Sequence, residues 1–86
     1  YFFLYQNYPN PFNPSANISF SVPKHSKIRL TVWNVLGKKV ATLVNDVRTA
    51  GEYSVRFDAS NMSGGIYFYK LEVNNTSYTK KMLYVK

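Results

Sequence analysis

Three prolines fall within six positions near the start of the chain, at Pro9, Pro11 and Pro14. Each proline fixes its own φ, removes a backbone donor and biases the residue before it toward extended geometry. The segment is therefore predicted to be a stiff, extended lead-in that carries two aromatic side chains, Tyr8 and Phe12. Two interpretations are open at this point. The segment is either a brace that tucks both aromatics against the core, or a docking feature that a partner reads.

After this lead-in the chain alternates apolar and polar side chains with a period of two, which is typical of β-strands. The predicted strands cover 17–22, 27–33, 38–44, 53–58, 66–73 and 76–85, with a weaker one at 2–6. Residues 45–51 are interpreted as a loop, and no segment shows helical periodicity. Turn signals recur at the spacing of a small antiparallel sandwich. We therefore expect one domain, 1–86, with an all-β, immunoglobulin-like sandwich of about seven strands.

Several turn residues have defined roles in this prediction. Gly37 closes a tight turn that begins at Asn34 and is free to adopt positive φ. The Asn74-Asn75 pair is predicted to form a two-residue hairpin turn. Tyr67 follows Gly65 at the start of a late strand, which is the position of a tyrosine corner. The alternation places Tyr67 on the core side of that strand.

The composition limits the classes of function. The net charge is +7, which either favours an anionic partner such as nucleic acid, lipopolysaccharide or an acidic protein face, or serves only to keep the domain soluble. No nucleic-acid-binding motif accompanies the basic residues, so no nucleic-acid partner is predicted. His25 is the only histidine, there is no cysteine, and the four carboxylates are isolated. We therefore expect no catalytic, metal-binding or cofactor-binding residues.

The ends and the hydropathy of the chain lead to two further expectations. No apolar run is long enough to span a membrane as a helix. The first residue is Tyr1 rather than methionine, which predicts that the chain is part of a larger protein.

Read in order, five sequence blocks together resemble a known family. They are the blocks at 4–14 (LYQNYPNPFNP), 18–20 (ISF), 32–40 (VWNVLGKKV), 64–71 (GGIYFYKL) and 79–83 (TKKML). They resemble the type A C-terminal sorting domain of the bacterial type IX (Por) secretion system. Trp33 and Asn34 stand where this family usually has Tyr-Asp, and Lys38 stands where it usually has Arg. The immunoglobulin-like domain of the flagellar hook-capping protein is a more distant resemblance.

The resemblance implies a non-enzymatic secretion signal at the end of a large secreted protein. Such a domain directs an N-terminal cargo from the periplasm through the outer-membrane translocon, after which the cargo is secreted or held at the cell surface. The implied partners are translocon and shuttle proteins, a sortase-like peptidase that typically removes the domain, and the fused cargo. Anionic lipopolysaccharide is a further neighbour, because cargo is attached to it in many of these systems.

Two sets of residues are candidates for the site. The candidates for translocon recognition are Asn10, Pro11, Phe12, Asn13, Pro14, Lys80, Lys81, Met82, Leu83 and Lys86, and the structural motif residues are Gly37, Gly65 and Tyr67. We expect the last strand to be a sheet edge with unpaired backbone groups. It would then dock by strand addition, while its lysines steer toward an acidic receptor face. A structural or adhesion module and a carbohydrate-binding module are the alternative functions.

Overall fold

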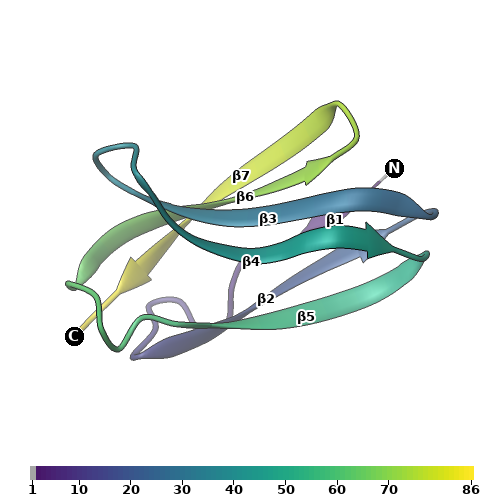
Figure 1. Cartoon of the computed structure of the whole chain (residues 1–86). Helices are drawn as coiled ribbons and strands as arrows, with labels where there is room; N and C mark the ends of the chain where they lie inside the picture. The colour runs from purple at the N-terminus through teal and green to yellow at the C-terminus, as the bar shows by residue number, and fades with distance from the viewer. Residues whose placement is uncertain (1) are drawn as a thin grey trace.

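The computed structural model describes residues 2–86, which form seven β-strands in two antiparallel sheets (Figure 1). The strands are β1 (Phe3–Leu4), β2 (Ser15–Val22), β3 (Ser26–Asn34), β4 (Lys39–Arg48), β5 (Gly51–Asp58), β6 (Gly65–Val73) and β7 (Thr76–Tyr84). Within the described residues there is no helix, and so none that could span a membrane. The predicted all-β sandwich of about seven strands is confirmed.

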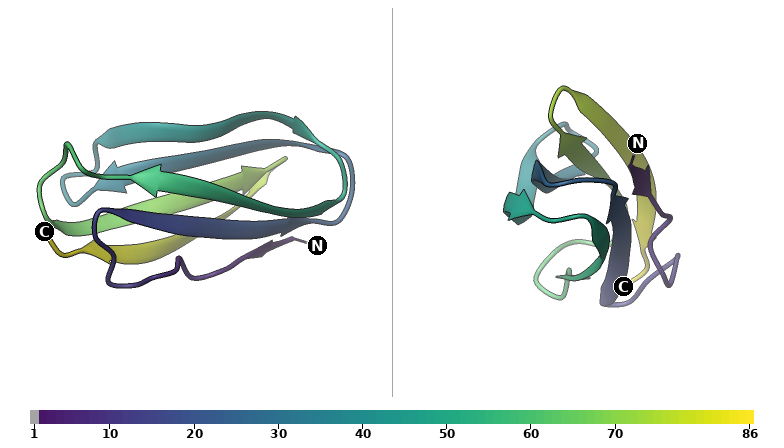
Figure 2. Two further views of the ribbon diagram at one scale, coloured as in Figure 1. Left: turned by 90° about the horizontal axis from the view of Figure 1, so that it is seen from below. Right: turned by 90° about the vertical axis from the view of Figure 1, so that its right-hand side faces the viewer.

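The two sheets pack face to face as separate layers, which the end-on view shows (Figure 2). One sheet has the strand order β1-β2-β5 and the other has the order β4-β3-β6-β7. The alternating side chains determine the inner faces: Ile18 and Phe20 of β2 meet Leu30 of β3 and Tyr69 of β6 in a core where each is fully buried. The predicted phase of β6 is correct, because Tyr67, Tyr69 and the apolar residues that continue the period are buried.

Among the described residues, three glycines and Asn74 have positive φ, and two of these glycines are the motif residues Gly37 and Gly65. Gly37 has φ +81 in the β3–β4 turn, where the Asn34 side chain accepts hydrogen bonds from the backbone N–H groups of Leu36 and Lys38. Gly65 has φ +144 at the start of β6. Two residues later, the Tyr67 hydroxyl donates to the Ser63 carbonyl oxygen at 2.6 Å. A tyrosine that bonds back to the backbone a few residues upstream, where the chain crosses between sheets, is the contact of a tyrosine corner.

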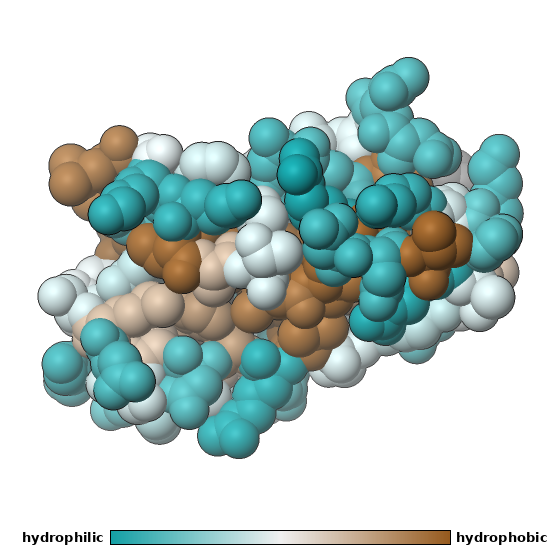
Figure 3. All heavy atoms as spheres, viewed as in Figure 1, coloured by the Kyte–Doolittle hydropathy of each residue, from teal (hydrophilic) through white to brown (hydrophobic). Residues whose placement is uncertain are grey.

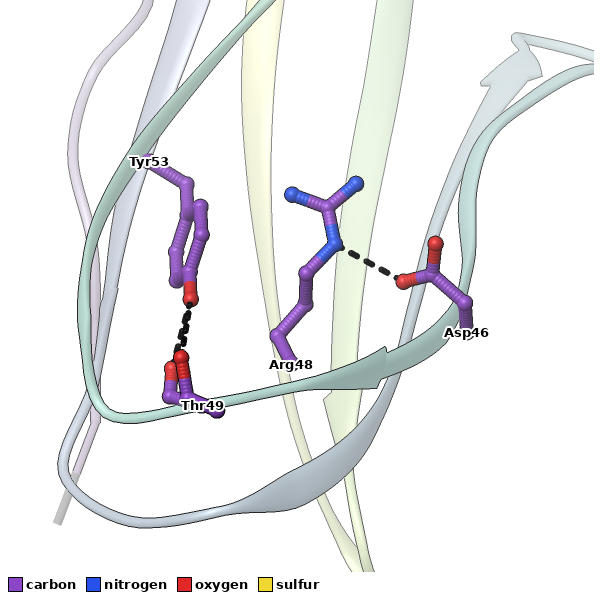
Figure 4. A network of polar contacts seen from close by, with 4 residues as sticks. All are labelled: Asp46, Arg48, Thr49 and Tyr53. Carbon is purple, nitrogen blue, oxygen red and sulfur yellow. Dashed lines mark hydrogen bonds and ion pairs between the residues drawn. The ribbon is translucent and has the colours of Figure 1, made fainter.

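The predicted loop at 45–51 is wrong over most of its length. Strand β4 continues through Arg48, and only Thr49 and Ala50 lie between it and β5. Figure 4 shows how this connection is fixed: the Tyr53 hydroxyl donates to the Thr49 carbonyl oxygen at 2.6 Å, and Arg48 bonds Asp46 at 2.8 Å. The guanidinium of Arg48 also lies 5.0 Å from the centre of the Tyr53 ring. The end of β4 was not recognised as a strand in the sequence, because most of its side chains are polar and exposed to solvent.

The side of the sandwich between β4 and β5 is less completely closed than the centre. Apolar side chains from both strands and from the following connection pack only partly buried against the core; they include Val40, Leu43, Val55 and Met62. The space-filling view shows apolar surface between polar side chains in the region of β4 and β5 (Figure 3). Thus β4 and β5 are the strands that end the two sheets on this side.

Candidate functional site

The proline-rich segment lies along the last strand, so two of the sequence blocks form one structural unit. The Phe12 N–H donates to the Leu83 carbonyl oxygen at 2.9 Å, and the Val85 N–H donates to the Phe12 carbonyl oxygen at 3.0 Å. The Asn10 side-chain oxygen accepts from the Leu83 N–H at 3.1 Å, although the two residues are 73 positions apart. Figure 2 shows the N-terminal segment running beside the end of β7. We call this unit, residues 6–14 with 81–85, the terminal junction.

Phe12 anchors the terminal junction in the core. Its side chain is 1% exposed and stacks on Tyr84, with ring centres 5.2 Å apart. The centres of the Phe12 and Phe57 rings lie 6.1 Å apart in an edge-on arrangement. The brace interpretation is therefore correct for Phe12 but wrong for Tyr8, which is 78% exposed. Tyr8 pairs with Asn17 through its backbone, so its ring is free to point away from the core.

Strand β7 is the edge strand of its sheet, as expected, but the part of this edge at 81–85 is covered by the chain itself, which corrects the strand-addition model there. Toward the end of the strand, the segment 6–12 bonds the outward backbone groups of Leu83 and Val85. The Gln6 side-chain amide donates to the Lys81 carbonyl oxygen at 2.8 Å. Nearer the start of β7, the ring of Phe2 lies 4.6 Å from that of Tyr78. The physical reason is that a sheet edge is stabilised by any extended segment that can pair with it, and the chain supplies its own.

A buried tyrosine fixes the beginning of the junction to the sheet. The Tyr69 hydroxyl donates to the Tyr5 carbonyl oxygen and accepts from the Asn7 N–H, both at 2.8 Å. Burial raises the pKa of Tyr69 to about 12, and the hydrogen bond from the Asn7 backbone opposes part of that rise. The buried Asn7 side chain donates to the Pro9 carbonyl oxygen and accepts from Gln6. These contacts leave no unpaired buried side-chain polar atom among the described residues.

The recognition candidates divide into buried and exposed residues. Phe12 and Met82 are core residues with exposures of 1% and 0%, so they position the backbone rather than present a surface. The exposed candidates are Asn10, Pro11, Asn13, Pro14, Lys81, Leu83 and Lys86. Lys80 is partly buried, and it borders a hollow of about 330 Å³ with Phe2, Phe3 and Tyr78.

Lys80 and Lys81 do not act as one charged pair. Lys80 lies on the same side of β7 as the buried Met82 and Tyr84, whereas Lys81 shares the outer face with Leu83. Lys86, beyond the strand, donates to the Met62 carbonyl oxygen at 3.3 Å. The three lysines that are close in sequence therefore face three different surroundings.

The chemistry available at the junction follows from its exposed side chains. Across residues 2–86, no group of three or more histidine, cysteine or carboxylate side chains could hold a metal ion. The Asp58 carboxylate accepts from the Ser60 N–H at 2.9 Å, and this hydrogen bond, the largest cause, lowers the pKa of Asp58. The exposed junction residues offer amides, prolines, one aromatic ring, aliphatic side chains and one ammonium group. Such groups suit contact with a protein surface.

Sequence reasoning missed the residues that join the two blocks, namely Gln6, Asn7, Tyr69 and Tyr84. Tyr69 could have been singled out as a tyrosine placed on the core side, because a buried hydroxyl requires a partner. The identity of that partner is not readable from the sequence, since Tyr5 and Asn7 are more than 60 positions away.

Comparison with protein families gives one match, over residues 6–86, to the secretion system C-terminal sorting domain. The chain belongs to this family. No curated protein and no solved structure shows significant similarity to the chain. The match begins at Gln6, the first residue of the terminal junction, and includes all of β7.

Membership identifies the chain as a sorting domain of the type IX secretion system. It implies a fused cargo and an interaction with that secretion system. It also implies that the protein carrying the sorting domain is secreted through the outer membrane or attached to the cell surface. Sorting domains of this family are in general non-catalytic.

Proposed function

We propose that this sorting domain is a non-catalytic secretion signal that directs its N-terminal cargo through the type IX translocon. The observation that carries the proposal is the terminal junction. The Asn-Pro-Phe-Asn-Pro block and the Lys-Lys-Met-Leu block are far apart in sequence, yet they are hydrogen-bonded side by side and anchored by Phe12 against Tyr84. A signal built in this way exists only in the folded chain. Translocon or shuttle proteins then read it as a surface while the cargo is in the periplasm.

The exposed half of the junction is the part that these proteins contact. Pro11, Asn13 and Pro14 form a stiff, exposed loop whose backbone is held by the buried Phe12. Lys81 and Leu83 extend this surface onto β7. A preorganised surface loses little conformational entropy on binding, which favours reading one signal on many cargoes. Once export is complete, a sortase-like peptidase removes the domain close to the anionic lipopolysaccharide of the cell surface.

An export assay tests the proposal directly. The chain is fused to the C-terminus of a periplasmic reporter and expressed in a bacterium with a type IX system, and also in an isogenic strain that lacks the translocon. We expect the reporter in the medium or on the cell surface only in the first strain. A folded fusion that stays in the periplasm of both strains would overturn the proposal.

A pair of matched variants tests the junction itself. Asn10→Ala with Asn13→Ala removes exposed amides from the loop, whereas Asn45→Ala with Asn61→Ala removes exposed amides elsewhere. The first pair should retain its fold, because the Asn10–Leu83 hydrogen bond contributes only about 0.5–1.5 kcal/mol. We expect export to fall for the first pair and to remain at the parent level for the second. Equal export of both pairs would remove the loop from the signal.

The alternative functions predict different results in the same strains. A structural or adhesion module would leave the reporter in the periplasm in both strains. A carbohydrate-binding module would give a defined set of hits on a glycan array, and a fusion that is exported without any glycan hit would exclude it.

A further inference from the structure

The strand register places two aromatic and two basic residues in a row across the four-stranded sheet, with a register shift between Val32 and Trp33. On β3 and β4, Trp33 lies opposite Lys39; on β6 and β7, Phe68 lies opposite Lys81; and Trp33 lies opposite Phe68 between them. Directly opposed residues share a face of the sheet, with Cβ atoms about 4.5–5.5 Å apart. We call these four residues the outer row.

The outer row is on the solvent side of the sheet. The residues next to it along the strands, Val32, Tyr69 and Met82, have exposures of 0% because they point into the core. Successive side chains of a strand point to opposite faces, so Trp33, Phe68 and Lys81 point outward. Trp33 and Phe68 are partly exposed, and Lys39 and Lys81 are exposed.

The centre of the outer row belongs to a wider apolar surface. Trp33 and Phe68 line a hollow of about 350 Å³ together with Val35, and one step further along the sheet Ile66 lies opposite Leu83. Ile66 and Leu83 are each 39% exposed. The Trp33 indole N–H is already bonded to the Thr31 hydroxyl at 3.0 Å, so the ring offers its apolar surface rather than a donor. A connected apolar surface of this kind marks an interaction site.

The charges around this surface are all positive. Lys39 and Lys81 end the outer row, and the Lys70 ammonium lies 6.0 Å from the centre of the Trp33 ring. The carboxylates of the same sheet, Asp46 and Glu72, lie toward its other end and are paired with Arg48 and Arg29 at 2.8 and 3.1 Å. The cations of the outer row are therefore not neutralised within the sheet.

We propose that the outer row, with Ile66 and Leu83, is a docking surface for a protein partner whose apolar patch is rimmed by carboxylates. This deepens the proposed sorting function and rests on it in so far as the partner belongs to the export machinery. Apolar burial supplies affinity at the centre, while the lysines steer the encounter and select an acidic rim. The surface adjoins the terminal junction, because Leu83 belongs to both and its N–H bonds Asn10.

Two other occupants fit the surface less well. A second copy of the chain would bring two identical cationic rims together, each on a molecule of net charge +7. A neutral sugar requires several directional donors and acceptors. The polar side chains that line the hollow between Trp33 and Phe68 are those of Asn34, Lys70 and Thr79. An anionic polysaccharide could meet the lysines but would leave the Ile66–Leu83 pair without an apolar partner.

A charge-reversal pair in the export assay tests the docking surface. Lys39→Glu with Lys81→Glu reverses both ends of the outer row, and Lys24→Glu with Lys27→Glu makes the same change of net charge toward the other end of the sandwich. All four lysines are exposed, so both pairs should fold, which melting curves check. We expect the outer-row pair to lose about tenfold or more in export, and the control pair to retain parent export. The docking surface would be overturned if both pairs were exported at the parent level or if both lost export equally. Either result would leave the parent's export, and so the sorting function, intact.

Trp33 allows a second test that does not depend on export, because it is the only tryptophan in the chain. Its fluorescence is followed while the chain is titrated with a synthetic strand peptide that alternates Glu and Leu, with the Lys–Leu peptide as a control, and with a polygalacturonate oligomer. We expect a shift with the Glu–Leu peptide alone, and a much weaker shift in the outer-row pair. If the parent fusion is not exported, the proposed sorting function is wrong, and this titration alone then tests whether the docking surface binds an acidic, apolar partner. A response to both peptides, to neither, or more strongly to polygalacturonate would overturn it.

Discussion

Tyr69 fixes the N-terminal segment to β6 through a single hydroxyl group. It donates to the Tyr5 carbonyl oxygen and accepts from the Asn7 N–H in a fully buried setting. In Tyr69→Phe both backbone groups lose this partner, so we expect a loss of about 1–3 kcal/mol in the free energy of unfolding. Urea denaturation measures it, with Tyr8→Phe as the control because Tyr8 is 78% exposed. Equal midpoints for Tyr69→Phe and the parent would show that water replaces the hydroxyl at no cost.

The same hydroxyl makes stability depend on alkaline pH. Burial raises the pKa of Tyr69 from 10.0 to about 12 in the folded chain. Between these values the unfolded chain loses the Tyr69 proton and the folded chain keeps it, so unfolding is favoured. The contribution is fully present below pH 10 and is lost as the pH rises toward 12. We expect the stability difference between the parent and Tyr69→Phe to shrink across this window in urea titrations. A constant difference would contradict the raised pKa.

At the scale of the element, the segment 6–14 covers the edge of β7 as an additional strand would. Phe12 is its buried anchor, and Phe12→Ala should lower the free energy of unfolding by about 3–5 kcal/mol through the cavity it leaves beside Phe57 and Tyr84. Hydrogen exchange then locates the damage. The Val85 amide, which donates to Phe12, should lose protection before the amides that join β3 to β6. Uniform loss of protection across all strands would show that the segment and the sandwich unfold as one unit.

The elements were predictable where one face of a strand is buried, as in β2 and β6, because burial imposes the period of two. The end of β4 was missed because Asn45, Asp46 and Val47 are all exposed, so no alternation marks it. The terminal junction was missed for a different reason. Its hydrogen bonds join residues 73 positions apart, and local pattern carries no information on which distant segment covers an edge. The candidate residues were therefore found as two separate motifs, and only the fold combines them.

At the scale of the whole molecule, the charge imbalance opposes folding, and in the proposed docking it favours an acidic partner. The net charge is +7, and the two ion pairs among the described residues, Arg29–Glu72 and Arg48–Asp46, are partly exposed and contribute little. Self-repulsion should therefore destabilise the compact state at low ionic strength. Raising NaCl from about 20 mM to about 500 mM shortens the Debye length severalfold, so we expect Tm to rise by a few degrees.

A variant of lower charge and a binding measurement complete this prediction. Lys24→Gln, Lys27→Gln and Lys38→Gln together lower the net charge by three at exposed positions, so the variant should show a smaller rise in Tm with salt. The same salt screens the attraction between the outer-row lysines and an acidic partner, so binding of the Glu–Leu peptide should weaken over the range in which the fold becomes more stable. Opposite responses of stability and binding are expected because salt screens both the repulsion within the chain and the attraction between the lysines and the peptide. A Tm that falls with NaCl would show that self-repulsion does not limit stability, and binding that strengthens with NaCl would show that charge attraction does not drive docking.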